Sequence, residues 1–380
     1  MIAGICREAA DGEQRVAISP EGVQALIELG FDVLVEEGAG THSSFTDAMY
    51  RDAGATLTGS RADVYASCDL LLGVQAPPME ELGNLKRESI LLSFIWPLQN
   101  KPYVEALQKH QITGLAVDTL PRISRAQSMD ALSTMSNIAG YKAALLGANH
   151  LDRYLPMMMT AAGTIPPAKV LVLGAGVAGL QAIATARRLG AVVEAFDIRP
   201  AVKEQVESLG ASFVDVPLEE ETETKSGYAK ELSERNKELQ RETIHNHIIK
   251  SDIVITTALI PGRPAPILVT RTSVEQMHPG SVIVDLAAEQ GGNCEATEPG
   301  KTVTVNGVKI LGPLDIPSQL AYHASKLYSK NLLSLLTLLM EDGKPNFNFD
   351  DEIIANTTIT HRGDIISPFV LEHYASNPTT

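Results

Sequence analysis

Three glycines in the spacing Gly-x-Gly-x-x-Gly stand at Gly174, Gly176 and Gly179, between the apolar run KVLVL and the small-residue run LQAIATARRL. Glycines at these places allow a tight turn, the approach of a pyrophosphate to the backbone, and close packing of a helix on a strand. The helix N-terminus adds partial positive charge at the anion. The spacing alone is weak evidence, but a strand before it and a helix after it predict a dinucleotide-binding turn.

A carboxylate follows the glycines at the distance that such a turn requires. The run AVVEAF ends at Asp197, about 20 residues after the glycines. A carboxylate there can accept the ribose hydroxyls and repels a 2′-phosphate, so the sequence favours NAD(H) over NADP(H). Arg199 complicates this choice, because a nearby arginine can bind a phosphate. The residues expected at the dinucleotide are Gly174, Ala175, Gly176, Val177, Gly179, Asp197, Ile198 and Arg199.

A second group of polar residues forms the run LPRISRAQSMD, residues 120–130, between a strand-like and a helix-like apolar segment. Most polar loops are surface turns, and Ser128 and Asp130 could cap the helix that follows. An arginine could also bind pyrophosphate or carboxamide oxygens, and an aspartate could accept from a carboxamide. The capping role and the binding role are compatible.

The elements that must position these residues alternate between strand and helix patterns. A helix is expected from Ser19-Pro20, an N-cap followed by proline, to Gly30 just past its end. Strand patterns include IAGIC, DVLVEE and ILLSFI. The alternation predicts an α/β fold with parallel sheets. The run LPMMMTAAGTIPPAK is expected to be a crossover into a second α/β unit.

The length of 380 residues predicts two domains. We place a Rossmann domain at residues 133–317 and an N-terminal Rossmann-like domain at residues 1–132 plus 318–380. The first domain is discontinuous because the long helix expected after Pro317 cannot join the completed second sheet without adding a layer. We expect a cleft between the domains and irregular structure from residue 343 onward.

Composition excludes several classes of function. A net charge of −15 argues against a nucleic-acid or anionic-membrane surface. Cys6, Cys68 and Cys294 lack metal-ligand spacing, so we expect reduced thiols, no metal site and a cytoplasmic protein. No secretory signal is recognised after Met1. The longest apolar run, NLLSLLTLLM, is short for a membrane span, which needs about 20 residues, so no direct membrane insertion is expected.

Longer motifs give a resemblance. RVAISPEGVQALIELGFDV, PRISRAQSMD, VITTALIPGRPAP and VDLAAEQGGNCE are similar to the alanine dehydrogenase and transhydrogenase superfamily, and most closely to the NAD(H)-binding component of proton-translocating NAD(P) transhydrogenase. The resemblance implies direct hydride transfer between NAD(H) bound here and NADP(H) on a partner subunit. It further implies a membrane-spanning subunit that translocates protons, a homodimer, and a location peripheral to the inner membrane through these partners.

The resemblance also implies roles for residues. Arg122, Gln127 and Asp130 would lie over the nicotinamide end of the nucleotide, with Gln127 coupling the two rings. Gly227 and Tyr228 resemble the tip of a mobile loop that closes over the nucleotide. The other residues implied at the cofactor are Ile123, Ser124, Arg125, Ser128, Met129, Ser133, Gln240 and Leu259.

Two other functions stay open: an NAD-dependent alanine-type amino-acid dehydrogenase and a non-catalytic NAD(H) sensor. The dehydrogenase must move a proton as well as a hydride. Where the alanine dehydrogenase pattern has lysine and histidine, this chain has Gln75 and Phe94, and Glu289 replaces an aspartate. Arg15, which resembles a substrate-carboxylate arginine, is retained, as a relic of that pocket or as a structural ion pair. Hydride exchange between two nicotinamides needs no protein proton donor.

Overall fold

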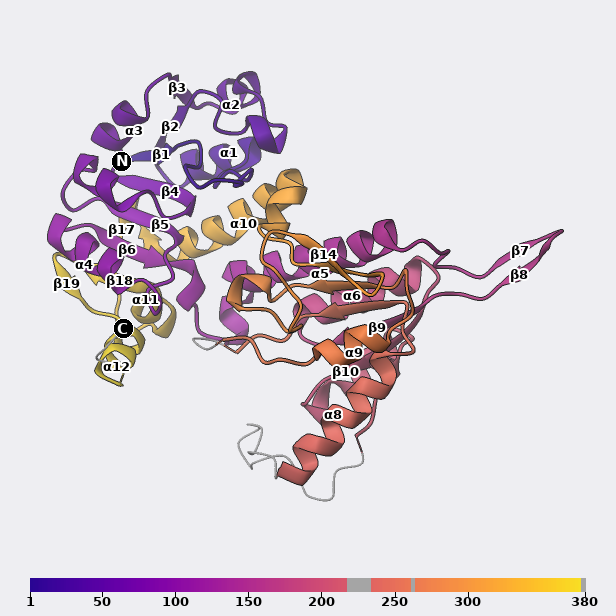
Figure 1. Ribbon diagram of the computed structural model, residues 1–380. Helices are drawn as coiled ribbons and strands as arrows, with labels where there is room; N and C mark the ends of the chain where they lie inside the picture. Colours follow the sequence, from indigo (N-terminus) through magenta and orange to yellow (C-terminus); the bar gives the residue numbers. More distant parts are fainter. Residues whose placement is uncertain (217–233, 261–263, 377–380) are drawn as a thin grey trace. The chain divides into compact units, whose positions relative to one another are not determined.

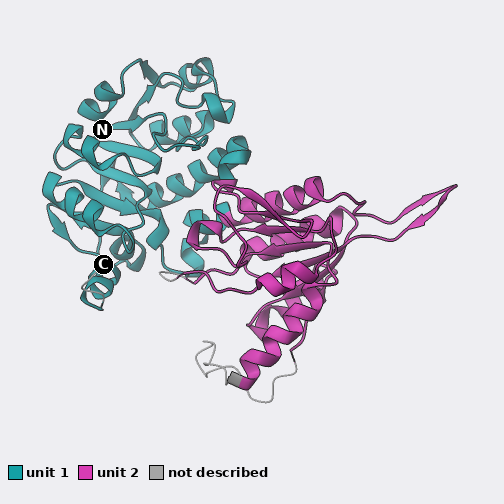
Figure 2. Cartoon of the chain, viewed as in Figure 1, with its two compact units in different colours: residues 1–135, 317–380 teal, residues 136–316 magenta. Residues whose placement is uncertain are grey.

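The computed structural model describes residues 1–216, 234–260 and 264–376. The chain divides into two compact units, residues 1–135 with 317–380 and residues 136–316 (Figure 2). Each unit is built around its own sheet. The predicted α/β class with largely parallel sheets is confirmed.

Unit 1 contains an eight-stranded sheet in the order β19-β18-β6-β5-β4-β1-β2-β3. The first six strands along the chain pair in parallel, whereas β18 is antiparallel to β6 and β19 to β18. The strands are β1 (Ile2–Ile5), β2 (Asp32–Glu36), β3 (Thr56–Thr58), β4 (Leu70–Gln75), β5 (Ile90–Phe94), β6 (Thr113–Ala116), β18 (Thr358–His361) and β19 (Asp364–Ile365).

The helices of unit 1 begin where the sequence places capping residues. Ser19 caps α1, its side chain accepting from the N–H of Gly22, and Pro20 is the first helical residue. The helices are α1 (Pro20–Glu28), α2 (Asp47–Asp52), α3 (Arg61–Ser67), α4 (Lys101–His110), α10 (Ala321–Leu339), α11 (Glu352–Thr357) and α12 (Pro368–Ser376). Helix α5 (Ala131–His150) runs from unit 1 into unit 2.

Helix α10 belongs to unit 1, far in sequence from the residues it contacts. The Tyr328 hydroxyl donates to the Gly73 carbonyl at 3.0 Å, and the Ser325 hydroxyl accepts from the Val16 N–H at 2.9 Å. Both residues of α10 are buried. Polar and apolar contacts together therefore hold α10 against unit 1.

The chain after residue 343 is regular, so the expectation of an irregular tail is wrong. Strand β18 is buried, and its Thr360 hydroxyl accepts from the Gly114 N–H at 3.0 Å and donates to the Ile112 carbonyl at 2.8 Å. Four residues are too few to show a period, which is why the strand escapes recognition in sequence.

Unit 2 contains a seven-stranded sheet in the order β11-β10-β9-β12-β13-β15-β14, in which only β14 is antiparallel to its neighbour. The chain leaves β9 toward β10 and β11 on one side and returns to β12 and β13 on the other. The strands are β9 (Lys169–Leu173), β10 (Val192–Phe196), β11 (Ser212–Phe213), β12 (Ile253–Thr256), β13 (Val282–Asp285), β14 (Thr302–Val305) and β15 (Val308–Leu311). Ligands of such sheets bind at the carboxyl ends of the strands where the direction reverses, here β9 and β12.

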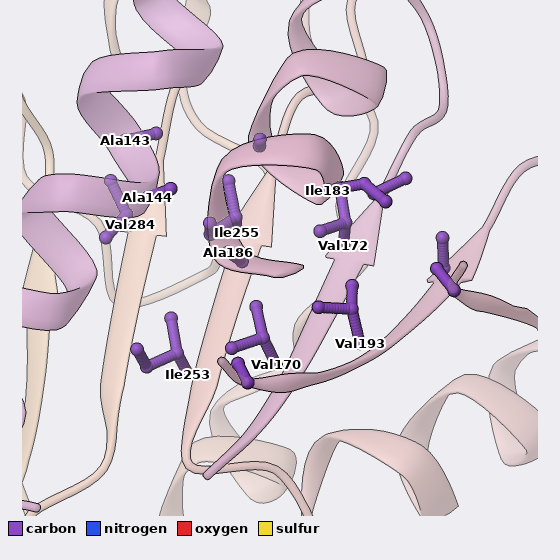
Figure 3. Packing of buried hydrophobic residues seen from close by; sticks show 14 of the residues in the cluster. Ala143, Ala144, Val170, Val172, Ile183, Ala186, Val193, Ile253, Ile255 and Val284 are labelled. Atoms are coloured by element: carbon purple, nitrogen blue, oxygen red, sulfur yellow. The ribbon is translucent and has the colours of Figure 1, made fainter. Parts of the chain in front are cut away.

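One face of this sheet packs on two helices. Figure 3 shows Val170 and Val172 of β9 and Ile255 of β12 near Ala144 of α5 and Ile183 of α6. Small residues let the helices approach closely: a Cβ added at Gly140 of α5 would collide with the backbone of Ala178. The helices of unit 2 are α6 (Val177–Arg188), α7 (Lys203–Ser208), α8 (Glu234–Ile248) and α9 (Arg271–Gln276).

The segment expected to be a plain crossover contains a hairpin. Strands β7 (Met158–Thr160) and β8 (Gly163–Ile165) pair antiparallel and project from the rest of unit 2 (Figure 1). The Met159 side chain is 77% exposed. The hairpin therefore presents apolar surface that no described part of the chain covers.

The described residues contain no helix that meets the length and hydropathy needed to cross a membrane. In the same residues, no group of histidine, cysteine, aspartate and glutamate side chains could hold a metal ion.

Candidate functional site

The glycine turn after β9 has the geometry of an anion-binding turn. Gly174 has a φ of +103°, and Thr257 Oγ1 lies 2.5 Å from the place of a Cβ there. A Cβ at Gly179 would collide with the Gly174 carbonyl oxygen. A Cβ at Gly176 would meet no atom within 4 Å, so the backbone there faces open space. The three glycines thus serve a turn, an open approach and a close helix contact.

Helix α6 begins at Val177, directly after this turn, with Gly176 as N-cap. No described side chain caps its N-terminus. Its first N–H groups and its dipole are therefore available to an anion from outside the chain.

Exposed apolar side chains surround the turn. Val177, Ile198 and Leu259 are 43%, 45% and 49% exposed. They follow β9, β10 and β12, which run parallel, so they belong to the same edge of the sheet. Apolar surface next to a few polar groups is typical of cofactor sites.

Asp197 lies directly after β10, at the same edge. Its carboxylate accepts hydrogen bonds from the backbone N–H groups of Ala175 and Arg199, both at 2.8 Å, and from the Arg199 guanidinium. Burial acts to raise the pKa of Asp197, but these bonds outweigh it and lower the pKa below its ordinary value. The carboxylate is therefore ionised at neutral pH and ties β10 to the glycine turn.

A second buried carboxylate at this edge was not singled out in the sequence. Asp285 ends β13 and is fully buried. It accepts five hydrogen bonds, from Thr256 Oγ1 at 2.8 Å, Ala287 N at 3.0 Å, Asn293 N at 2.8 Å, Cys294 N at 3.0 Å and Thr297 Oγ1 at 2.6 Å. The signal that could have found it is its position: like Asp197, it ends an apolar strand.

Asn293 and Thr257 were also missed, and both hold the segment after β12 in place. The buried Asn293 side chain donates to the carbonyls of Ala258 and Pro266, at 2.9 and 2.7 Å, and accepts from the Ala258 N–H at 3.0 Å. The Thr257 hydroxyl donates to the Gly174 carbonyl at 3.0 Å. These bonds fix the chain next to Leu259 against the glycine turn.

The polar loop of unit 1 forms a short 3-10 helix, Ser124–Met129, before α5. Asp130 caps α5: its carboxylate accepts from the N–H and the hydroxyl of Ser133, at 2.8 and 2.5 Å. Ser128 does not cap; its carbonyl accepts from the Asn331 side chain at 2.8 Å. The capping role predicted for Asp130 is therefore present, and the one predicted for Ser128 is not.

Other residues of this loop differ in their availability. The side chains of Arg122 and Gln127 are exposed and make no hydrogen bond or ion pair with any described residue. Arg125 instead forms a bidentate pair with Asp351, at 2.7 and 2.8 Å. Ser124 is exposed, Ile123 and Ser133 are half-buried, and Met129 is buried.

Arg15 is part of a buried ion pair in unit 1. Its Nε lies 2.7 Å from Glu13 Oε1, and its Nη2 lies 2.5 Å from Glu13 Oε2. Ser318 and Gln75 donate to the same carboxylate, at 2.5 and 3.1 Å. Burial acts to raise the pKa of Glu13, but the bonds from Arg15 and Ser318 lower it to about 2. Of the two alternatives for Arg15, the structure supports the structural ion pair.

The other positions compared with an amino-acid dehydrogenase are also occupied. Phe94 is buried and stacks on Tyr328, with ring centroids 5.4 Å apart. Glu8 accepts from the N–H groups of Val74 and Gln75, at 2.7 and 3.0 Å, and burial raises its pKa to about 7. Glu289 is exposed and accepts from a backbone N–H. Glu8 can titrate near neutral pH, but β4 engages both of its oxygens.

Two predicted residues lie outside the described part of the chain, Gly227 and Tyr228. Gln240 lies half-buried on α8. The other predicted residues fall into two groups: residues 174–199 with Leu259 gather at one edge of the unit 2 sheet, and residues 122–133 form one segment of unit 1.

Comparison with known proteins gives the family. Residues 4–139 match the model of the N-terminal domain of alanine dehydrogenase/PNT, and residues 143–368 match that of the C-terminal domain. An NAD(P) transhydrogenase alpha subunit of Rhodospirillum rubrum is 50% identical over 373 residues, covering 96% of this chain and 97% of the relative. Alanine dehydrogenase of Mycobacterium tuberculosis is 36% identical over 302 residues, covering 79% of this chain and 76% of the relative.

A solved structure agrees with this assignment. The transhydrogenase from Sinorhizobium meliloti superposes with a TM-score of 0.88 at 46% identity, covering 96% of this chain and all of the other. The chain therefore belongs to the alanine dehydrogenase and NAD(P) transhydrogenase family, a family of nucleotide-binding oxidoreductases.

Proposed function

We propose that the chain is the NAD(H)-binding subunit of a proton-translocating NAD(P) transhydrogenase. In this proposal it exchanges hydride directly with NADP(H) held by a partner subunit, and a membrane-spanning subunit couples the exchange to proton translocation. The observation that carries the proposal is the open glycine turn next to Asp197 in a chain 50% identical to a transhydrogenase alpha subunit.

The proposed cofactor contacts follow from chemistry at the edge of the sheet. The N-terminus of α6 suits a pyrophosphate, and the ionised Asp197 disfavours a 2′-phosphate. Gly176 leaves room for the approach. In unit 2 the proposed contacts are Gly174, Ala175, Gly176, Val177, Gly179, Asp197, Ile198, Arg199, Gln240 and Leu259, with Gly227 and Tyr228 outside the described residues.

In unit 1 we propose contacts from Arg122 to Ser133 at the nicotinamide end. Arg122 and Gln127 have side chains with no described partner, so binding a nucleotide would break no bond of theirs. Asp130 uses two hydrogen bonds for its cap, and a carboxylate offers about four lone-pair sites. It can therefore accept a carboxamide NH2 while it caps α5. Ile123, Ser124, Arg125, Ser128 and Met129 complete this proposed set.

The chemistry asks little of this chain beyond position. NAD(H) supplies or accepts the hydride, and a second nicotinamide is the other reactant. Such a transfer needs close, oriented rings and no protein proton donor. Gln75 and Phe94 carry no titratable group, which suits this reaction better than amino-acid oxidation.

We also infer assembly with other chains. The exposed hairpin β7–β8 supports a homodimer, because Met159 and Ile165 are 77% and 42% exposed and isolated hairpins are marginally stable in water. The membrane component would be a separate subunit, so the chain would lie peripheral to the inner membrane through its partners.

The homodimer predicts that Met159→Asp shifts the chain from dimer to monomer in analytical ultracentrifugation. A charge placed on a covered apolar surface is costly to desolvate. Met49→Asp, at another exposed methionine on α2, is the matched control and should leave the dimer intact. A wild-type chain that sediments as a monomer would contradict the dimer.

The enzymatic proposal is tested with the purified chain and the NADP(H)-binding component of a transhydrogenase. We expect NADPH to reduce an NAD analogue only when both proteins are present. With NAD and alanine, the chain alone should form no NADH. Activity with alanine and none with the partner would favour the amino-acid dehydrogenase, and binding of NADH without either activity would favour the sensor.

Gln127→Asn should slow hydride exchange roughly 10- to 100-fold, because its amide is withdrawn by one methylene and misplacement of reacting groups is costly. The affinity for NADH should stay within about three-fold, since the pyrophosphate site is untouched. Gln276→Asn, the same change at an exposed residue of α9, is the control. Stopped-flow turnover equal to the wild type would remove the proposed role of Gln127.

A further inference from the structure

The Asp197 carboxylate has no free place for a ribose hydroxyl. Its Oδ1 accepts from the Arg199 backbone N–H at 2.8 Å and from Arg199 Nε at 3.0 Å. Its Oδ2 accepts from the Ala175 N–H at 2.8 Å and from Arg199 Nη2 at 3.0 Å. A carboxylate offers about four lone-pair sites. All four are therefore in use before any ligand arrives.

The two guanidinium bonds are the ones that can be removed. Both backbone bonds belong to the loops after β9 and β10 and persist as long as those loops keep their shape. The Asp197 side chain is 7% exposed, whereas that of Arg199 is 52% exposed. Among the described residues, Asp197 supplies every acceptor that the Arg199 side chain uses. Arg199 can thus swing into solvent without breaking another contact.

The departure of Arg199 frees a matched pair of positions. Oδ1 would lose Nε and Oδ2 would lose Nη2, so each oxygen gains one free acceptor site. An adenosine ribose presents two neighbouring hydroxyls, each of which donates one hydrogen bond. The bidentate guanidinium and the ribose diol therefore satisfy the same two acceptor sites.

We propose that Arg199 is a specificity-determining residue that occupies the ribose position on Asp197 and is displaced by the two hydroxyls when NAD(H) binds. The inference rests on the proposed function only in taking NAD(H) as the ligand of unit 2. Displacement is cheap because an ion pair with a half-exposed partner contributes little. A 2′-phosphate cannot make the same exchange, since it would replace the guanidinium with negative charge beside the carboxylate.

The protonation state of the pair supports this exchange. Burial acts to raise the pKa of Asp197, but its bonds from Arg199 and Ala175 hold the pKa below the ordinary value. The carboxylate therefore stays charged near neutral pH and remains an acceptor for the ribose after Arg199 has left.

Removal of the competing side chain is the first test. Arg199→Ala in the full-length chain keeps the backbone N–H bond to Asp197 but exposes the acceptor sites. Isothermal titration calorimetry should show NADH binding roughly two- to five-fold tighter than in the wild type, the range set by a weak surface pair. Arg188→Ala removes the same charge from an exposed residue at the far end of α6 and should leave the affinity unchanged.

An unchanged or weaker affinity of Arg199→Ala for NADH would overturn the inference, because it would make Arg199 a bystander or a direct ligand. A wild-type chain that binds no NADH would instead overturn the proposed function, so the two failures are distinct. Thermal unfolding of each variant verifies that the fold is intact.

The selectivity is tested from the opposite side of the pair. Asp197→Asn removes the carboxylate charge and releases Arg199, so NADPH should bind at least about five-fold tighter than to the wild type and NADH more weakly. The double variant Asp197→Asn/Arg199→Ala should lose most of the gain in NADPH affinity. A gain that persists in the double variant would show that Arg199 does not meet the 2′-phosphate and would contradict its role in specificity.

Discussion

The site in unit 2 depends on the close approach of α6 to the end of β9. No side chain fits at Gly179, because a Cβ would collide with the carbonyl of Gly174, and the Thr257 hydroxyl bonds that same carbonyl at 3.0 Å. This contact aims the N-terminus of α6 past the open backbone of Gly176. A larger residue at Gly174 or Gly179 would push the helix away and remove the anion site with it.

Two buried or nearly buried carboxylates hold the loops around this contact. Asp197 ties the loop after β10 to the glycine turn, and Asp285 gathers five donors after β12 and β13. Asp285 stabilises loops rather than presenting a titrating group to a substrate. Glu8, whose pKa is raised to about 7 by burial, is engaged by the backbone of β4. The chain thus offers position and charge, which is what hydride exchange between two nicotinamides requires.

The local features of this structure could be predicted from sequence, and the distant ones could not. The glycine turn, the strand that ends at Asp197 and the cap at Asp130 depend on residues a few positions apart, so spacing and residue type suffice. The pairing of Arg125 with Asp351 joins residues 226 positions apart, and the five donors of Asp285 come from separate segments. Strand β18 and the hairpin β7–β8 are too short to show a period. Even at Asp197, spacing predicted the carboxylate but not the arginine that fills its acceptor sites.

The central claim is that this chain holds one nicotinamide for direct transfer to another, without a protein group or solvent carrying the hydrogen. The most direct measurement uses NADH deuterated at the transferred position of C4, the chain, the NADP(H)-binding component and NADP+, in ordinary water. Direct transfer predicts that mass spectrometry finds the deuterium retained in the NADPH formed, with no hydrogen taken from solvent at that carbon. Loss of the label to water would contradict the account.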